Sequence, residues 1–142
     1  HKTGNIGLGF VRGFGFKAGA LASTVAHDSH NLLVIGVDNE DMAFAANKLI
    51  DIGGGMIIVK NKNVLGLVEL PVAGLMSLDK AEVVAEKVKG LSKAWNQIAR
   101  EMISPFMTIS LLSLSVLPEI RVTDKGVIDT INFKRIPLIE TN

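Results

Sequence analysis

The residues best suited to chemistry lie together in one short stretch, His27-Asp28-Ser29-His30-Asn31. The stretch holds two of the three histidines, and its five polar side chains separate two apolar runs, 19–26 and 32–37. Burying such groups without partners costs on the order of a few kcal/mol each. These side chains must therefore face water, pair with one another or contact a ligand. We call this stretch the polar block.

The H-x-x-H spacing of the two histidines leaves three interpretations open. On a helix, positions i and i+3 share a face and can bind one metal ion, whereas on a strand they point to opposite sides. The flanking apolar runs are typical of buried strands, which weakens the metal interpretation. The alternatives are a loop that contacts a ligand, and a structural cluster in which Asp28 accepts a backbone hydrogen bond. Further metal ligands would come from Asp38, Glu40, Asp41 or His1.

Several enzyme classes are disfavoured by missing motifs. Ser29 lacks the G-x-S-x-G context of a nucleophile elbow, and Glu69 stands alone on a predicted strand. The chain has no cysteine, which excludes the H-x-E with P-C-x-x-C signature of zinc nucleobase deaminases. The glycines of 6–16 are spaced G-x-G-x-x-x-G-x-G with no helix after them, so they do not form a dinucleotide-binding turn. We interpret 6–16 as a strand that allows close approach of another backbone.

Composition limits the partners of the protein. The 142 residues predict one domain, and a net charge of +1 gives no basic face for nucleic acid. No signal peptide or membrane span is evident, since the most apolar run, 109–117, is shorter than the about 17 residues that a span needs. The absence of cysteine suits a reducing cytoplasm. The opening without Met and the apolar composition indicate a piece of a longer protein whose apolar face meets a neighbouring domain.

The pattern of elements predicts an α+β fold, with a mixed, mainly antiparallel sheet and two principal helices packed on one of its faces. Strands are expected within 19–26 and 32–37, followed by a helix from about Glu40 to Ile52 that is capped by Asp38 or Asn39. Gly53 has the position of a helix C-cap glycine. A hairpin of 56–60 and 64–70 is expected next, followed by a helix that starts at Ser77 or Asp79, with Glu82 as capping-box partner, and runs to about Ile103. Residues 106–117 are expected to form a bulged strand or, less favoured, a short buried helix. The chain then continues with a hairpin of 119–122 and 127–132 and a surface extension over 133–142.

The chain strongly resembles the C-terminal domain of the microbial adenine deaminases of the amidohydrolase superfamily. The resemblance covers about residues 2–129, and the polar block is its most specific part. We therefore expect a domain over 1–132 and an extension over 133–142. The motifs that carry it are Thr3-Gly4-Asn5, Gly13-Phe14-Gly15, Lys17-Ala18-Gly19-Ala20, 23–31, Asp41-Met42-Ala43, Ile52-Gly53-Gly54-Gly55, Glu69-Leu70-Pro71, Ala73-Gly74-Leu75-Met76-Ser77, Pro105-Phe106-Met107-Thr108, Leu117-Pro118-Glu119 and Thr123-Asp124-Lys125-Gly126.

The resemblance implies hydrolysis of adenine to hypoxanthine and ammonia in purine salvage by a cytoplasmic enzyme that forms homo-oligomers. In such enzymes a metal-bearing (β/α)8 barrel precedes this domain, and its manganese or iron activates the attacking water. The barrel's H-x-H ligands do not occur here, so we assign this fragment no metal or other cofactor and expect it to be inactive alone. Its partners would be the barrel domain and adenine, with no nucleic acid and no membrane.

Two roles for the domain follow as hypotheses. In the first, the polar block faces the mouth of the barrel. His27, Asp28 and His30 then play a supporting catalytic role, and Ser29 and Asn31 contact the substrate. In the second, the domain only docks to the barrel and builds an oligomer interface, without touching substrate.

Overall fold

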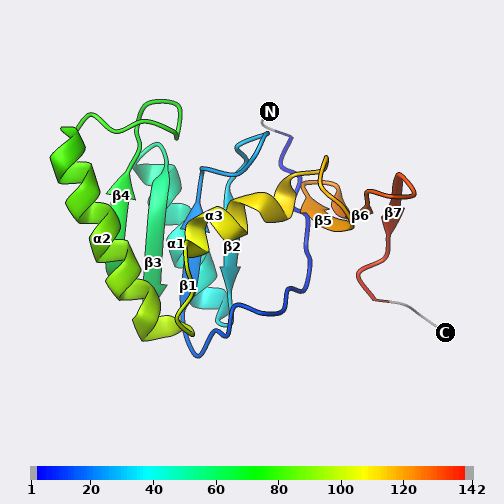
Figure 1. Ribbon diagram of the computed structural model, residues 1–142, viewed down its shortest axis with the longest axis horizontal. Helices are drawn as coiled ribbons and strands as arrows, with labels where there is room; N and C mark the ends of the chain where they lie inside the picture. Colours follow the sequence, from blue (N-terminus) through cyan, green and yellow to red (C-terminus); the bar gives the residue numbers. More distant parts are fainter. Residues whose placement is uncertain (1–2, 140–142) are drawn as a thin grey trace.

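The computed structural model describes residues 3–139 and confirms an α+β fold. Two antiparallel sheets and three α-helices make up the described part of the chain (Figure 1). The elements in order are β1 (Ala20–Ser23), β2 (Leu33–Gly36), α1 (Asn39–Asp51), β3 (Gly55–Lys60), β4 (Asn63–Glu69), α2 (Ala81–Ile98), α3 (Pro105–Ser110), the 3-10 helix η1 (Leu111–Ser113), β5 (Ile120–Thr123), β6 (Gly126–Asp129) and β7 (Lys134–Ile136).

The larger sheet has the strand order β2-β1-β3-β4, and every neighbouring pair is antiparallel. Both apolar runs that flank the polar block are confirmed as strands, and the first of them, β1, is central. All four residues of β1 are buried. The block itself connects β1 to β2, so it lies at the end of the sheet where β1 ends and β2 begins.

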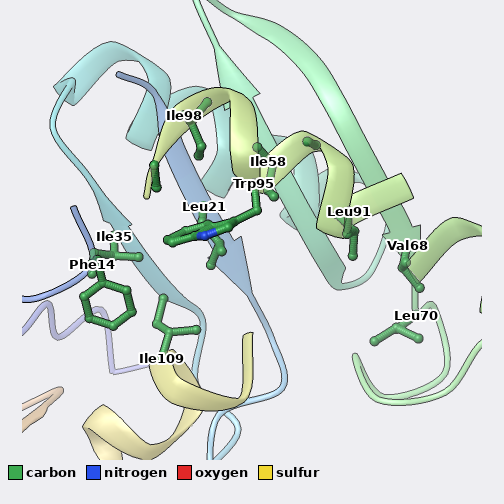
Figure 2. Packing of buried hydrophobic residues seen from close by; sticks show 12 residues of the cluster. Phe14, Leu21, Ile35, Ile58, Val68, Leu70, Leu91, Trp95, Ile98 and Ile109 are labelled. Atoms are coloured by element: carbon green, nitrogen blue, oxygen red, sulfur yellow. The ribbon is translucent and has the colours of Figure 1, made fainter. Parts of the chain in front are cut away.

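The two long helices cover opposite faces of this sheet, which corrects the expectation that they share one face. Successive residues of a strand point to opposite faces, and Leu21 belongs to the core that contains α2 residues while Ala22 belongs to the core that contains α1 residues. Trp95 of α2 lies over Leu21 and Ile58 in the first core (Figure 2). The sheet is therefore the middle layer of three, with α2 in front and α1 behind it in Figure 1.

Helix α1 has the caps that the sequence predicted. The Asp38 carboxylate accepts a hydrogen bond from the backbone N–H of Asp41 at 2.9 Å, and Gly53 past the helix end has φ +82°. Asp41 is buried, and its carboxylate accepts from the backbone N–H groups of Asn61 and Lys62 at 2.9 and 2.6 Å. The first turn of α1 thus fixes the predicted β3–β4 hairpin, whose two turn residues both have positive φ.

Helix α2 is shorter than predicted at both ends. It begins at Ala81 with Lys80 as an N-cap that makes no side-chain hydrogen bond, so the expected capping box does not form. It ends at Ile98 rather than near Ile103, because the next residues bond to the segment before β1. The carbonyl of Ile98 accepts from Lys17 and Ala18, and the N–H of Arg100 donates to Gly15.

The glycine-rich stretch 6–16 is not a strand, contrary to its alternating pattern. Gly13 and Gly15 have φ of +110° and +65°, which breaks an extended ladder. The expected close approach of another backbone does occur. A Cβ atom at Gly7 would lie 1.6 Å from the carbonyl oxygen of Thr123, so only glycine fits this contact with the β5–β6 hairpin.

The segment 106–117 forms α3 and η1, so the favoured bulged strand was wrong and the alternative of a short buried helix is confirmed. Pro105 occupies the first turn, where its missing N–H costs nothing. Ile109 is completely buried. Phe106 and Leu112 pack against the same core, so apolar residues three positions apart face it, as on a helix.

The small sheet β5-β6-β7 lies beside the three layers (Figure 1). Its first hairpin turns at Asp124 and Lys125, as predicted. Residues 134–136 of the expected extension form its third strand, and 140–142 lie outside the described residues. No helix within 3–139 has the length and apolar character that a membrane crossing requires.

Candidate functional site

The polar block forms one tight loop at the end of β1. The backbone N–H of His30 donates to the carbonyl of Ala26 at 2.7 Å, which closes the loop, and His30 has φ +50°. The peptide bond between His27 and Asp28 is cis. Because Ala26 is completely buried while Asp28 and Ser29 are exposed, the loop begins in the core and carries its tip into solvent.

The two histidine rings lie together rather than on opposite sides. Their centroids are 5.6 Å apart with the planes at 68°, an edge-to-face arrangement. A strand would have separated them, but the turn at 27–29 brings them to one side. The Nδ1 atom of His30 accepts a hydrogen bond from the backbone N–H of Ala26 at 3.3 Å. His30 therefore has a structural role, and only its Nε2 atom is left to meet a ligand.

Helix α3 and η1 hold the loop of the polar block by hydrogen bonds to the backbone of His27. The backbone N–H of His27 donates to the carbonyl of Ser110 at 3.1 Å, and the hydroxyl of Ser113 donates to the carbonyl of His27 at 3.1 Å. These bonds use only the backbone of His27, so its imidazole stays available. The backbone of His27 is thus held by two serines that lie more than 80 residues further along the sequence.

The tip of the loop presents the free part of the block. Asp28, Ser29 and Asn31 are exposed, and within residues 3–139 their side chains form no hydrogen bond. A carboxylate, a hydroxyl and an amide supply both donors and acceptors. The block therefore divides into an internally bonded half, which holds the shape, and an exposed half that is able to contact a ligand.

The acidic residues suggested as additional metal ligands are elsewhere. Asp38 caps α1 and Asp41 fixes the β3–β4 turn, both beyond the opposite end of β2 from the block. Glu40 pairs with Lys62 at 2.8 Å. In the described part of the chain, no three His, Asp or Glu side chains gather as a metal site would need. His1 lies outside the described residues.

Sequence reasoning missed the residue that connects the block to its neighbouring loop. The Thr24 hydroxyl accepts from the backbone N–H of Gly55 at 2.8 Å and donates to the carbonyl of Gly74 at 2.6 Å. Gly54 and Gly74 pack so closely here that a Cβ on Gly54 would lie 2.5 Å from the Cα of Gly74. A threonine at the end of a strand, opposite two glycine-bearing loops, was the available signal.

A charged cluster lies near the same end of the sheet. Lys87 of α2 contacts Asp79 at 2.6 Å and Glu69 at 3.4 Å. The hydrogen bond with Asp79 is the main reason that the pKa of Lys87 is raised above its usual value. Beside it is a shallow hollow of about 220 Å³, lined by Ile52, Glu69, Pro71, Ser77, Leu78 and Asp79.

Residues 3–139 thus form a three-layer α+β domain with a histidine-bearing loop at one end of its larger sheet. The chain belongs to the family described as the adenine deaminase C-terminal domain, which it matches over residues 1–134.

The curated relatives bear the name adenine deaminase. One from Moorella thermoacetica is 57% identical over 96% of this chain, one from Clostridium botulinum is 55% identical over 97%, and one from Staphylothermus marinus is 47% identical over 98%. The match occupies 23% of the length of each relative. The chain therefore spans less than a quarter of the proteins that it resembles.

Proposed function

We propose that this chain acts as part of an adenine deaminase, which uses one water molecule to convert adenine to hypoxanthine and ammonia. The support is membership in the C-terminal domain family and the name of the relatives. In this proposal the remaining part of the polypeptide is a metal-bearing barrel that binds adenine. The enzyme would work in purine salvage in the cytoplasm as a homo-oligomer.

The metal would be a divalent ion, manganese or iron, bound outside this domain. The residues described here do not fit a metal centre, because they bring together no group of three possible ligands. We therefore derive no catalytic step from a metal and assign it no ligand among these residues.

The role proposed for the polar block rests on one observation. The side chains of Asp28 and Ser29 project into solvent from a loop that Ser110 and Ser113 hold by its backbone. Such a loop can offer preorganised hydrogen bonds to a ligand without first paying for ordering. In the proposal, His27, Asp28 and His30 support catalysis at the barrel mouth, and Ser29 and Asn31 contact the purine.

Variants of the complete enzyme test this role. Asp28→Asn removes a charge, and Ser29→Ala and His27→Ala remove polar groups, at side chains that make no hydrogen bond within 3–139, so the fold should survive these changes. We expect kcat/KM for adenine to fall about 10- to 100-fold in at least one of them, since a hydrogen bond to a charged group contributes about 1.5–3 kcal/mol. Asn47→Ala, at an exposed position of α1, is the matched control.

His30→Ala needs a separate measurement of stability, because it also removes the bond from Ala26. Unchanged kcat and KM in all the block variants, with melting temperatures near that of the unsubstituted enzyme, would reject the role in catalysis. The second hypothesis, a domain that docks without touching substrate, would then stand. The hydrogen bond from the Ala26 N–H to Nδ1 of His30 favours this second hypothesis, because it gives that histidine a structural role.

A further inference from the structure

The loop that follows β4 exposes several apolar side chains. Val72, Leu75, Met76 and Leu78 have exposed fractions of 36, 37, 60 and 80% within seven residues. Single exposed apolar residues are normal, but a contiguous group of this kind marks an interaction surface. We call residues 71–78 the apolar loop.

The apolar loop is held in shape by its own backbone. The N–H of Val72 donates to the carbonyl of Met76 at 3.2 Å, and the N–H groups of Met76 and Leu75 donate to the carbonyl of Val72 at 3.1 Å. Ala73 and Gly74 have φ of +56° and +72°, which turns the chain sharply. These backbone bonds shape the loop in which the four apolar side chains are exposed.

The apolar loop lies at the same end of the sheet as the polar block. β1 and β4 both end here and β3 begins here, because β3 lies between β1 and β4 and runs antiparallel to both. Thr24, three residues before the polar block, bonds to the apolar loop, since its hydroxyl donates to the carbonyl of Gly74. In Figure 1 the apolar loop and the loop after β1 both lie at the upper end of the sheet.

We propose that the apolar loop and the exposed tip of the polar block form one docking face, and that the part of the polypeptide outside this domain covers it. The inference rests on the proposed function, which supplies that occupant. The relatives carry more than three-quarters of their length outside the match, so a large surface is available.

The docking face also explains the mixture of side chains. Apolar residues beside the polar block exclude water from the contact, and hydrogen bonds are stronger where water is excluded. The apolar loop would then seal the edge of the site that the block faces. Its residues determine closure and placement, whereas the residues of the block make the polar contacts.

Cysteine labelling of the complete enzyme tests the docking face, because this domain has no cysteine of its own. Met76→Cys and Leu78→Cys place thiols on the face. Val37→Cys is the matched control, since Val37 has an exposed fraction of 61% against 60% for Met76 and follows β2 at the opposite end of the sheet. The modified peptide is quantified by mass spectrometry after brief exposure to a maleimide reagent.

We expect Met76→Cys and Leu78→Cys to react at least about tenfold more slowly than Val37→Cys, at rates that do not change on dilution, because a covered thiol reacts only when the contact opens. Equal rates at the three positions would overturn the inference. Protection that disappears on dilution would also overturn it and would assign the face to a second copy.

The result is separable from the catalytic proposal. Slow labelling combined with unchanged kinetics of Asp28→Asn and Ser29→Ala supports the docking face and rejects the catalytic role of the block. Fast labelling of Met76→Cys and Leu78→Cys combined with impaired kinetics of Asp28→Asn or Ser29→Ala rejects the docking face and supports the catalytic role of the block.

Discussion

Thr24→Val probes the connection between the segment after β1 and the apolar loop after β4. Valine keeps the branched shape of threonine but has no hydroxyl. It therefore removes the acceptor of the Gly55 N–H and the donor to the Gly74 carbonyl, at 2.8 and 2.6 Å. Gly55 and Gly74 are both buried, so water does not readily replace the lost partner.

The expected loss follows from these two groups. A buried donor or acceptor left without a partner costs about 1–3 kcal/mol, so the free energy of unfolding should fall by about 2–4 kcal/mol. For a domain of this length, that corresponds to a decrease in Tm of roughly 5–15 °C. Thr24→Ser retains the hydroxyl and loses only one methyl group, so it should cost about 1 kcal/mol or less.

Urea unfolding of the 142-residue chain, followed by tryptophan fluorescence, measures both variants. Trp95 is the single tryptophan and lies in the core against the same sheet. The reasoning would be refuted if Thr24→Val lowered the free energy of unfolding by less than about 0.5 kcal/mol, or if the valine and serine variants lost the same amount. Either result would mean that the two hydrogen bonds of the hydroxyl, at about 1 kcal/mol each, do not stabilise the fold.

Two further changes test the structure away from this end. Gly90→Ala in α2 should raise the free energy of unfolding by about 0.5–1 kcal/mol, because a Cβ there meets nothing within 4 Å and alanine loses less backbone entropy on folding. A free energy of unfolding below that of the unsubstituted protein would contradict a helical position for Gly90. The Asn132 side chain and the backbone N–H groups of Asn132 and Ile131 bond to Asp129 and lower its pKa. Because the pKa of Asp129 is lower in the folded state, its carboxylate stabilises the fold at pH values above the usual pKa of aspartate, and this stability is lost as the pH falls through the lowered pKa. Asp129→Asn should therefore weaken the dependence of the free energy of unfolding on acidic pH. An unchanged dependence would argue against these bonds.

Local signals predicted much of the fold. Asp38 as N-cap, Gly53 at the helix end and the two hairpin turns each depend on residues within a few positions of one another. The ends of α2 were not predictable in this way. Its last turn is replaced by bonds to residues 15–18, about 80 positions away, and these decide where the helix stops.

The position of the polar block between two strands was predicted, but the shape of its loop was not. The polar block is confirmed as a loop between two strands. The pairing of the His27 and His30 rings, and the support from Ser110 and Ser113, required tertiary contacts that no spacing reveals. Thr24 was overlooked because its partners come from two other loops.

The register of strand β1 determines the position of the loop that follows it. Leu21 fills one core and Ala22 the other, so sliding the strand by one position would put the small side chain where the large one is needed, and the reverse on the far side. Such a slip would also carry His27 about 3.3 Å along the strand axis, beyond reach of the Ser110 carbonyl. The unequal sizes of two adjacent interior residues therefore set the position of the imidazole at the surface.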